Sequence, residues 1–134
     1  MADRFRQHQL PGIARGRRPR IRETVIAKDC EAELNRRGYA VYRIQCGLWF
    51  PYKGTHPYSG APAGTPDYVA IHGERLSFLL ETKASDGQLE PSQKFQHQVI
   101  QQSYRLAICI VRDVWSLIEW LDRFEAQQGS VMSG

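Results

Sequence analysis

The sequence predicts an α/β domain with a mixed central sheet flanked by helices, and two observations carry this prediction. Segments of helical periodicity alternate with short apolar or β-branched segments, in the order helix, strand, long loop, strand, strand, helix, strand, helix. The two strands after the long loop are joined by a short turn, which favours antiparallel pairing. At 134 residues, the chain is long enough for one domain with a substantial core.

The first predicted helix spans about residues 22–37 and ends at Gly38, a residue typical of helix C-termini. Its apolar stripe recurs every four residues and consists of Ile26, Cys30 and Leu34. Glu23 lies on the same stripe in the first turn. The simpler interpretation of this carboxylate is a favourable interaction with the helix dipole. A strand is predicted next, over residues 39–45.

A long loop follows, from Cys46 to Thr65, which is rich in glycine and proline. It contains Trp49, Tyr52 and Lys53. Aromatic side chains interleaved with cations suit nucleic-acid contact, by base stacking and phosphate pairing. The alternative, which weighs equally, is that the aromatic side chains attach the loop to the core.

Residues 64–84 are predicted to form two strands joined at the turn 72–75. Alternation places Asp67 at the start of the first strand and places Glu81 and Lys83 on one face near the end of the second. Pairing the strands brings these three charged groups to one edge of an apolar hairpin. Because unpaired buried charge is costly, a bound divalent cation is one reason for the arrangement. Taken alone, a Glu-x-Lys sequence is more often a solvated charge pair on an exposed strand.

The next helix is predicted from Pro91 to about Ser103, with Gln93 in its first turn near the preceding strand. His97 is interpreted as a surface residue of this helix. The predicted apolar stripe consists of Phe95, Val99 and Ile100.

The unbroken apolar run 106–111 predicts a buried strand. Asp113 can then cap a final helix that ends near Ala126. Residues 127–134 are predicted to form a disordered tail.

Residues 1–21 are predicted to form a flexible basic arm. Residues 1–22 contain seven arginines and one acid, a formal charge of +6, whereas the rest contains 11 basic and 13 acidic residues, a formal charge of −2. Arginine binds phosphate by charge and by bidentate hydrogen bonds. The candidate DNA-binding residues here are Arg15, Arg17, Arg18, Arg20 and Arg22. The alternative is a solubilising tail without a partner.

Some classes of protein are disfavoured by composition. The sequence has no apolar run of 18 residues and its N-terminus has no apolar segment like a secretory signal, so neither a membrane partner nor secretion is expected. The three cysteines have no zinc-like spacing and suit a reducing cytoplasm.

Taken in order, these residues resemble the PD-(D/E)XK nuclease superfamily, whose restriction-endonuclease-like core is αβββαβ, and within it the VRR-Nuc domain. The matching residues are Glu23, Gly38, Gly47, Gly64, Pro66, Asp67, Glu81, Lys83 and Gln93. The resemblance covers about residues 22–126. The long loop departs from the pattern and puts substrate preference in doubt, and the basic arm is not explained by it.

The resemblance implies a deoxyribonuclease that requires Mg2+ or Mn2+. Asp67 and Glu81 would hold the cation, with the carbonyl of Thr82 as a further ligand, and Glu23 would contact the metal directly or through water. Lys83 would orient or help deprotonate the attacking water. Gln93 would hold that water or a phosphate oxygen.

The resemblance also implies a standalone enzyme of a bacterial or phage-infected cell, acting on branched DNA such as four-way junctions, usually as a homodimer. Trp115 and Trp120 lie off the centre of the last helix's apolar stripe and are candidates for the dimer face. Two alternatives stay open. One is a non-catalytic DNA-binding module that keeps the fold, and the other is an interaction or regulatory protein such as a phage accessory factor.

Overall fold

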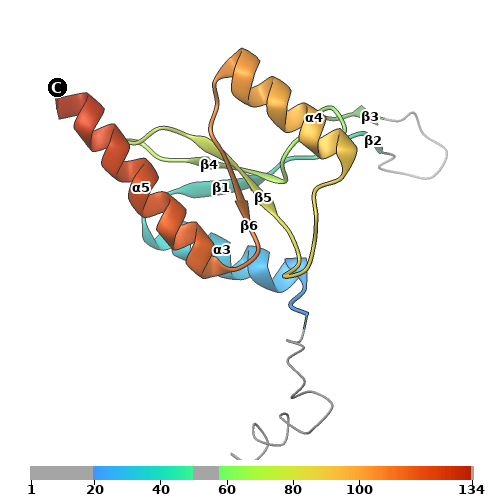
Figure 1. The fold of residues 1–134 in the computed structure, drawn as a ribbon, viewed down its shortest axis with the longest axis horizontal. Helices are drawn as coiled ribbons and strands as arrows, with labels where there is room; N and C mark the ends of the chain where they lie inside the picture. The colour runs from blue at the N-terminus through green and yellow to red at the C-terminus, as the bar shows by residue number, and fades with distance from the viewer. Residues whose placement is uncertain (1–19, 50–57, 134) are drawn as a thin grey trace, which may run out of the picture.

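The computed structural model describes residues 20–49 and 58–133. Within them the chain has a mixed α/β architecture, as the sequence predicts, with a four-stranded mixed sheet and three α-helices (Figure 1). The elements in chain order are α3 (Glu23–Arg36), β1 (Ala40–Arg43), β2 (Leu48–Trp49), β3 (Tyr58–Ser59), β4 (Tyr68–Ile71), β5 (Phe78–Thr82), α4 (Pro91–Val99), the π-helix η1 (Ile100–Tyr104), β6 (Ile108–Val111) and α5 (Val114–Ser133).

The strand order of the main sheet is β1-β4-β5-β6. β1 pairs with β4, and β4 with β5, in antiparallel register, whereas β5 and β6 are parallel and connected through α4. In the β4–β5 pair, Tyr68 lies opposite Leu80, so the start of β4 lies beside the end of β5. The predicted hairpin is therefore confirmed. Its second strand is central in the sheet, which explains why every residue of β5 is buried.

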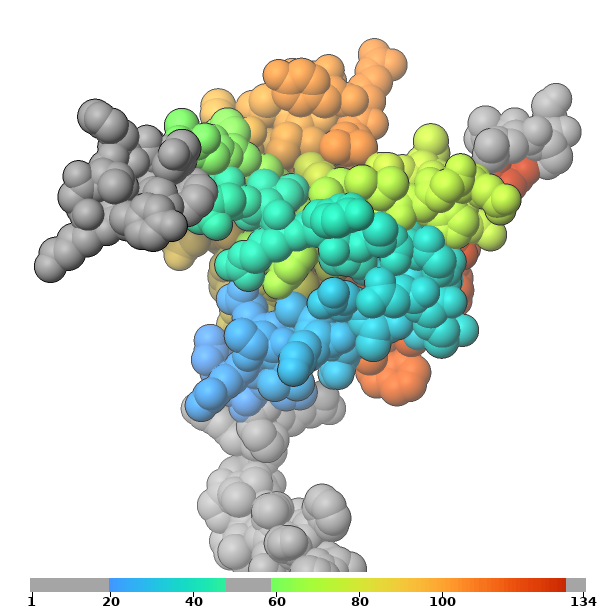
Figure 2. All heavy atoms as spheres, turned by 180° about the vertical axis from the view of Figure 1, so that it is seen from behind, coloured from blue at the N-terminus to red at the C-terminus, as the bar shows by residue number. Residues whose placement is uncertain are grey.

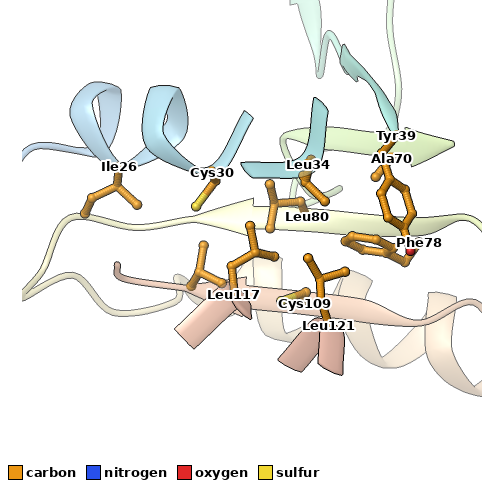
Figure 3. Packing of buried hydrophobic residues seen from close by; sticks show 11 residues of the cluster. Ile26, Cys30, Leu34, Tyr39, Ala70, Phe78, Leu80, Cys109, Leu117 and Leu121 are labelled. Atoms are coloured by element: carbon orange, nitrogen blue, oxygen red, sulfur yellow. The ribbon is translucent and has the colours of Figure 1, made fainter. Parts of the chain in front are cut away.

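The two faces of the sheet are covered differently. Helices α3 and α5 lie on one face, and α4 lies on the other (Figure 1). Side chains of α3 and α5 converge on Phe78 and Leu80 of β5 and form the main core (Figure 3). Because successive β5 residues point to opposite faces, Leu79 and Glu81 face α4 instead. Leu79 forms a smaller apolar cluster there with Ile100 and Ile108. The face of the sheet under α4 thus has the smaller apolar cluster. The polar residues at the end of β5 point to this face.

Helix α3 ends at the position that the sequence predicts. Gly38 has a φ of +93°, a conformation that glycine adopts without steric cost. The N–H of Tyr39 donates to the carbonyl of Leu34 and the N–H of Gly38 to that of Asn35, which is the Schellman pattern. The side chains of Leu34 and Tyr39 are both buried in the main core. The turn therefore joins α3 to β1 at a defined angle.

One prediction for the C-terminal part needs a correction. α5 does not end near Ala126 but continues to Ser133, so a tail beginning at residue 127 is wrong for the described residues. Gln128 explains the extension, because its buried side chain accepts a hydrogen bond from the N–H of Leu76. Trp120 is half-buried, because its ring stacks on Phe124 at 4.5 Å between centroids and packs against Phe78, so part of its surface is left exposed and its predicted place in a dimer face stays a prediction. Trp115 is 73% exposed, as predicted.

The long loop has structure at its two ends. β2 and β3 form a small antiparallel sheet, and Cys46 bridges to Ala61. Tyr52 and Lys53 lie outside the described residues, as does the side chain of Trp49, so their predicted DNA contact stays a prediction.

The apolar stripe predicted for α4 is wrong at Phe95, which is 67% exposed. The face turned to the sheet contains Gln93 and His97 of α4 and, as predicted, Ile100 at the start of η1, at helical spacings of four and three. Phe95 lies two residues from Gln93 and from His97, so it points away from this face. The inward face is half polar because it covers the polar end of β5.

No helix among the described residues is long and apolar enough to cross a membrane. Cys30, Cys46 and Cys109 are free thiols. Cys30 and Cys109 are buried in the main core, as small apolar side chains would be, while Cys46 is half-buried.

Candidate functional site

Glu81 and Lys83 lie at the C-terminal end of β5, on the face that α4 covers. Both are buried, with 1% and 8% of their surface exposed. The ammonium nitrogen of Lys83 is 3.9 Å from Oε2 of Glu81. This pair does not match the alternative of a solvated charge pair on an exposed strand. Burial of two ionisable groups requires compensation from other polar groups.

Asp67 immediately precedes β4 and reaches the same place from the neighbouring strand. Its Oδ2 accepts hydrogen bonds from the main-chain N–H and the hydroxyl of Thr82, at 3.2 and 3.3 Å. Asp67 therefore fixes the position of Thr82, the residue that lies between Glu81 and Lys83 in the sequence. The antiparallel pairing of β4 with β5 brings these residues together, as the alternation in the sequence predicts.

Gln93 joins α4 to both charged residues of β5. Its Oε1 accepts from Nζ of Lys83 at 2.7 Å and from the N–H of Glu90 at 2.8 Å, and its Nε2 donates to Oε2 of Glu81 at 3.2 Å. Because two donors converge on one atom of the amide, that atom must be the oxygen. The orientation of the amide is thus determined by its partners, and the NH2 group necessarily faces Glu81.

The start of α4 explains how Gln93 reaches this position. Glu90 and Gln93 form a capping box, and Pro91 occupies the first turn. Gly64 lies directly against this turn, because a Cβ built on it would be 2.3 Å from the carbonyl oxygen of Ser92. A larger residue at position 64 would therefore push the first turn of α4 away from the loop that leads to Asp67.

Glu23 approaches the site from α3. It lines a hollow of about 140 Å3 whose wall also includes Asp67, Arg43 and Thr82. The N-terminal residues of α3 are exposed at the surface (blue in Figure 2). The charge of Glu23 contributes to raising the pKa of Glu81. Glu23 thus lies at the edge of the site. A favourable interaction with the helix dipole would not by itself require this position.

The carboxyl group of Glu81 is strongly perturbed. Burial, and next the negative charge of Asp67, raise its pKa to about 8 from an ordinary value of 4.5, against the opposing effect of Lys83. Its Oε1 is buried and has no hydrogen-bond partner among the described residues. Two neighbouring carboxyl groups, one of them buried, repel each other when both are ionised, and a cation between them would offset that repulsion.

The residues present fit a hard divalent cation. Asp67 and Glu81 offer carboxylate oxygens, the ligands that Mg2+ prefers, and Mg2+ commonly takes one or two carboxylates and keeps water or phosphate in its other positions. Among residues 20–49 and 58–133, no group of three or more His, Cys, Asp or Glu side chains is arranged so that it could hold a metal ion.

His97 is a member of this site that sequence reasoning missed. The predicted surface position is wrong, because His97 is 5% exposed and its Nε2 lies 3.4 Å from Oε1 of Glu81. Burial, and next the charge of Lys83, lower the pKa of the imidazole. The available signal was its spacing, since His97 follows Gln93 by four residues and thus shares its helix face.

The predicted DNA-binding arginines are only partly described. Arg15, Arg17 and Arg18 lie outside the described residues. Arg20 is exposed and pairs with Asp86 at 2.7 Å, and the main chain of Ile21 exchanges hydrogen bonds with Ser85. Arg22 is exposed immediately before α3. The chain therefore enters the domain next to the turn that follows Lys83, close to the candidate site.

Comparisons with protein-family models, curated proteins and solved structures gave no significant match.

Proposed function

We propose that this protein is a metal-dependent deoxyribonuclease that hydrolyses phosphodiester bonds at the site formed by Asp67, Glu81, Lys83 and Gln93. The observation that carries the proposal is the buried Glu81 carboxyl group, which has Asp67 as a neighbouring carboxylate and a lysine bridged to it by Gln93. A purely structural site gains nothing from this arrangement, because an apolar residue at position 81 would avoid the cost of burial.

The order of elements also supports the proposal. Helix α3, strands β1, β4 and β5, helix α4 and strand β6 follow the αβββαβ order of the PD-(D/E)XK core, with β2 and β3 as an insertion. Asp67 immediately before β4, Glu81 on β5 and Lys83 immediately after β5 support the proposal, because the superfamily motif implies the same residue types in this order. Glu23 on the first helix and Gln93 on the second agree with the VRR-Nuc pattern.

In the proposed reaction, Asp67 and Glu81 hold Mg2+ or Mn2+, with the Thr82 carbonyl as a candidate third ligand and Glu23 at the edge. The cation would supply Lewis acidity toward the phosphate and lower the pKa of bound water. Lys83 donates one of its three ammonium N–H groups to Gln93, and the other two would orient the attacking water and stabilise charge that develops on the phosphate. Gln93 holds Lys83 and Glu81 at a defined separation.

The experiment is a cleavage assay on plasmid, forked and four-way-junction DNA with Mg2+, Mn2+ or EDTA. We expect cleavage only with metal, and a reduction of about 10²- to 10⁴-fold in Asp67→Asn and Lys83→Met. Lys94→Met is the matched control, because Lys94 is exposed on the same helix as Gln93. Wild-type-like cleavage by Asp67→Asn or Lys83→Met contradicts the site assignment. DNA binding without cleavage under any condition favours the non-catalytic module.

We propose branched DNA as the preferred substrate and a homodimer as the active form. The same panel tests the substrate, since equal cleavage of linear and branched DNA contradicts the preference. Light scattering at micromolar concentration tests the dimer, with Trp115→Ser as the informative variant because Trp115 is the exposed tryptophan of α5. Salt-dependent binding, with and without residues 1–19, tests the arginine arm, whose removal should reduce the salt dependence of the affinity.

A further inference from the structure

His97 places a second polar atom of α4 against Glu81. Gln93 and His97 are four residues apart on α4, so their side chains lie one above the other on the same helix face. Gln93 donates to Oε2 of Glu81, and Nε2 of His97 lies 3.4 Å from the other oxygen, Oε1. The two oxygens of one carboxyl group thus each face one side chain of α4.

Both partners of the His97–Glu81 contact are unsatisfied. Among the described residues, Oε1 of Glu81 and both ring nitrogens of His97 are buried without a hydrogen-bond partner. Three unpaired polar atoms in one place cost folding free energy, and a leucine at position 97 would avoid most of that cost. A packing role alone therefore does not explain a histidine here.

The chemistry of the pair indicates which hydrogen bond it can form. Nε2 of an imidazole carries a proton and can donate a hydrogen bond both in the imidazolium and in one of the two neutral tautomers. An ionised Glu81, which cation binding requires, can only accept hydrogen bonds. The proton of His97 then belongs on Nε2, which faces Oε1, and a small approach from 3.4 Å gives a normal hydrogen bond.

We infer that His97 is a positioning residue, whose Nε2–H donates to Oε1 of Glu81 and, together with Gln93 on Oε2, holds the Glu81 carboxylate in one orientation for cation binding. The inference rests on the proposed metal site. It assigns to His97 no contact with the cation or the substrate, because the contact that the structure presents is with Glu81. Groups that orient a metal-binding side chain commonly change metal affinity by about 10- to 100-fold when they are removed.

Three variants of the full chain separate a positioning role from a packing role. His97→Gln keeps an N–H donor near the place of Nε2, His97→Asn keeps one nearer the main chain, and His97→Leu has none. Mn2+ binding is measured by isothermal titration calorimetry in the absence of DNA. The free energy of unfolding is measured by urea denaturation in EDTA, where no metal contributes.

We expect His97→Leu to unfold at the same or a higher urea concentration than wild type in EDTA, because it removes unpaired buried atoms. The same variant should bind Mn2+ about 10- to 100-fold more weakly. His97→Gln should restore most of the affinity and His97→Asn should not. A packing role would not produce this pattern. In it, Mn2+ affinity is lost without a loss of stability, and the affinity is restored only by a donor in the place of Nε2.

Other results overturn the inference in distinguishable ways. Wild-type Mn2+ affinity in His97→Leu overturns the positioning role and leaves the metal site intact. A loss of stability that parallels the loss of affinity in all three variants shows that His97 acts through folding. Failure of the wild-type protein itself to bind Mn2+ overturns the proposed metal site together with this inference.

Discussion

The ammonium group of Lys83 donates a hydrogen bond of 2.7 Å to Oε1 of Gln93, across the interface between β5 and α4. Ten residues separate the two in the sequence, and the contact forms because the capping box of α4 holds the Gln93 side chain toward the sheet. Lys83 and Glu81 are 3.9 Å apart, so each of them lies closer to the amide group of Gln93 than to the other.

Replacing Gln93 with leucine should lower the free energy of unfolding by about 1–3 kcal/mol, because Lys83, Glu81 and the N–H of Glu90 each lose a partner. Urea denaturation at neutral pH measures the change. Gln98→Leu is the matched control, since Gln98 is exposed on the same helix. Equal stability of the two variants would show that the bridge has no energetic role.

The stability of the metal-free protein should decrease as the pH rises from about 5 to 8. Glu81 has an ordinary pKa of 4.5 and a folded-state pKa raised to about 8. Below pH 4.5 both states hold the proton. Between these values only the unfolded state releases it, so the folded state loses at most about 1.4 kcal/mol per pH unit. Above pH 8 the loss is complete.

Unfolding in EDTA at several pH values, with wild type and Glu81→Gln, measures this dependence. The glutamine variant cannot ionise, so its stability should change less over the same range. Parallel curves for the two proteins would mean that Glu81 is not the group responsible.

An acid-dependent loss of stability should come from Glu33. Hydrogen bonds from Arg36 and then Arg37 lower its pKa to about 2, so its contribution is present above pH 4.5 and is lost as the pH falls toward 2. Arg36 is exposed and contributes little, whereas Arg37 is mostly buried and also pairs with Asp122 and Glu125 of α5.

We therefore expect Glu33→Gln to lower the free energy of unfolding by about 1–3 kcal/mol at pH 7 and to have little effect at pH 2. Glu31→Gln, at an exposed position of the same helix, is the control. A pH-independent effect of Glu33→Gln would indicate lost packing and not a lost ionic contact.

Gly64→Ala should be strongly destabilising and should also weaken the site. Gly64 has a φ of +92°, and an added Cβ would meet the main chain of Ser92 at 2.3 Å. Strain of this kind costs about 1–3 kcal/mol, before the displacement of α4 is counted. Gly73→Ala is the control because nothing lies within 4 Å of its Cβ position. Thermal unfolding and Mn2+ binding of both variants test whether the glycine positions Gln93.

The predictions that rested on local pattern were the accurate ones. Alternation along residues 64–84 was enough to place Asp67 beside Glu81 and Lys83, since antiparallel pairing around a short turn leaves little freedom of register. Gly38 ended α3 because the requirement for a positive φ is local. These features depend on residues that are near in the sequence.

The tertiary structure alone decided which polar residues are buried. Sequence reasoning placed apolar Phe95 inward and His97 outward, and the structure reverses both, because α4 covers the polar end of β5 and not an apolar surface. The length of α5 and the partial burial of Trp120 likewise depend on contacts with Leu76 and Phe78, more than 40 residues away. The sequence by itself determined which charged groups meet on the hairpin. Packing between distant elements determined how Gln93 and His97 surround Glu81, because burial is a property of the assembled layers and not of any one segment.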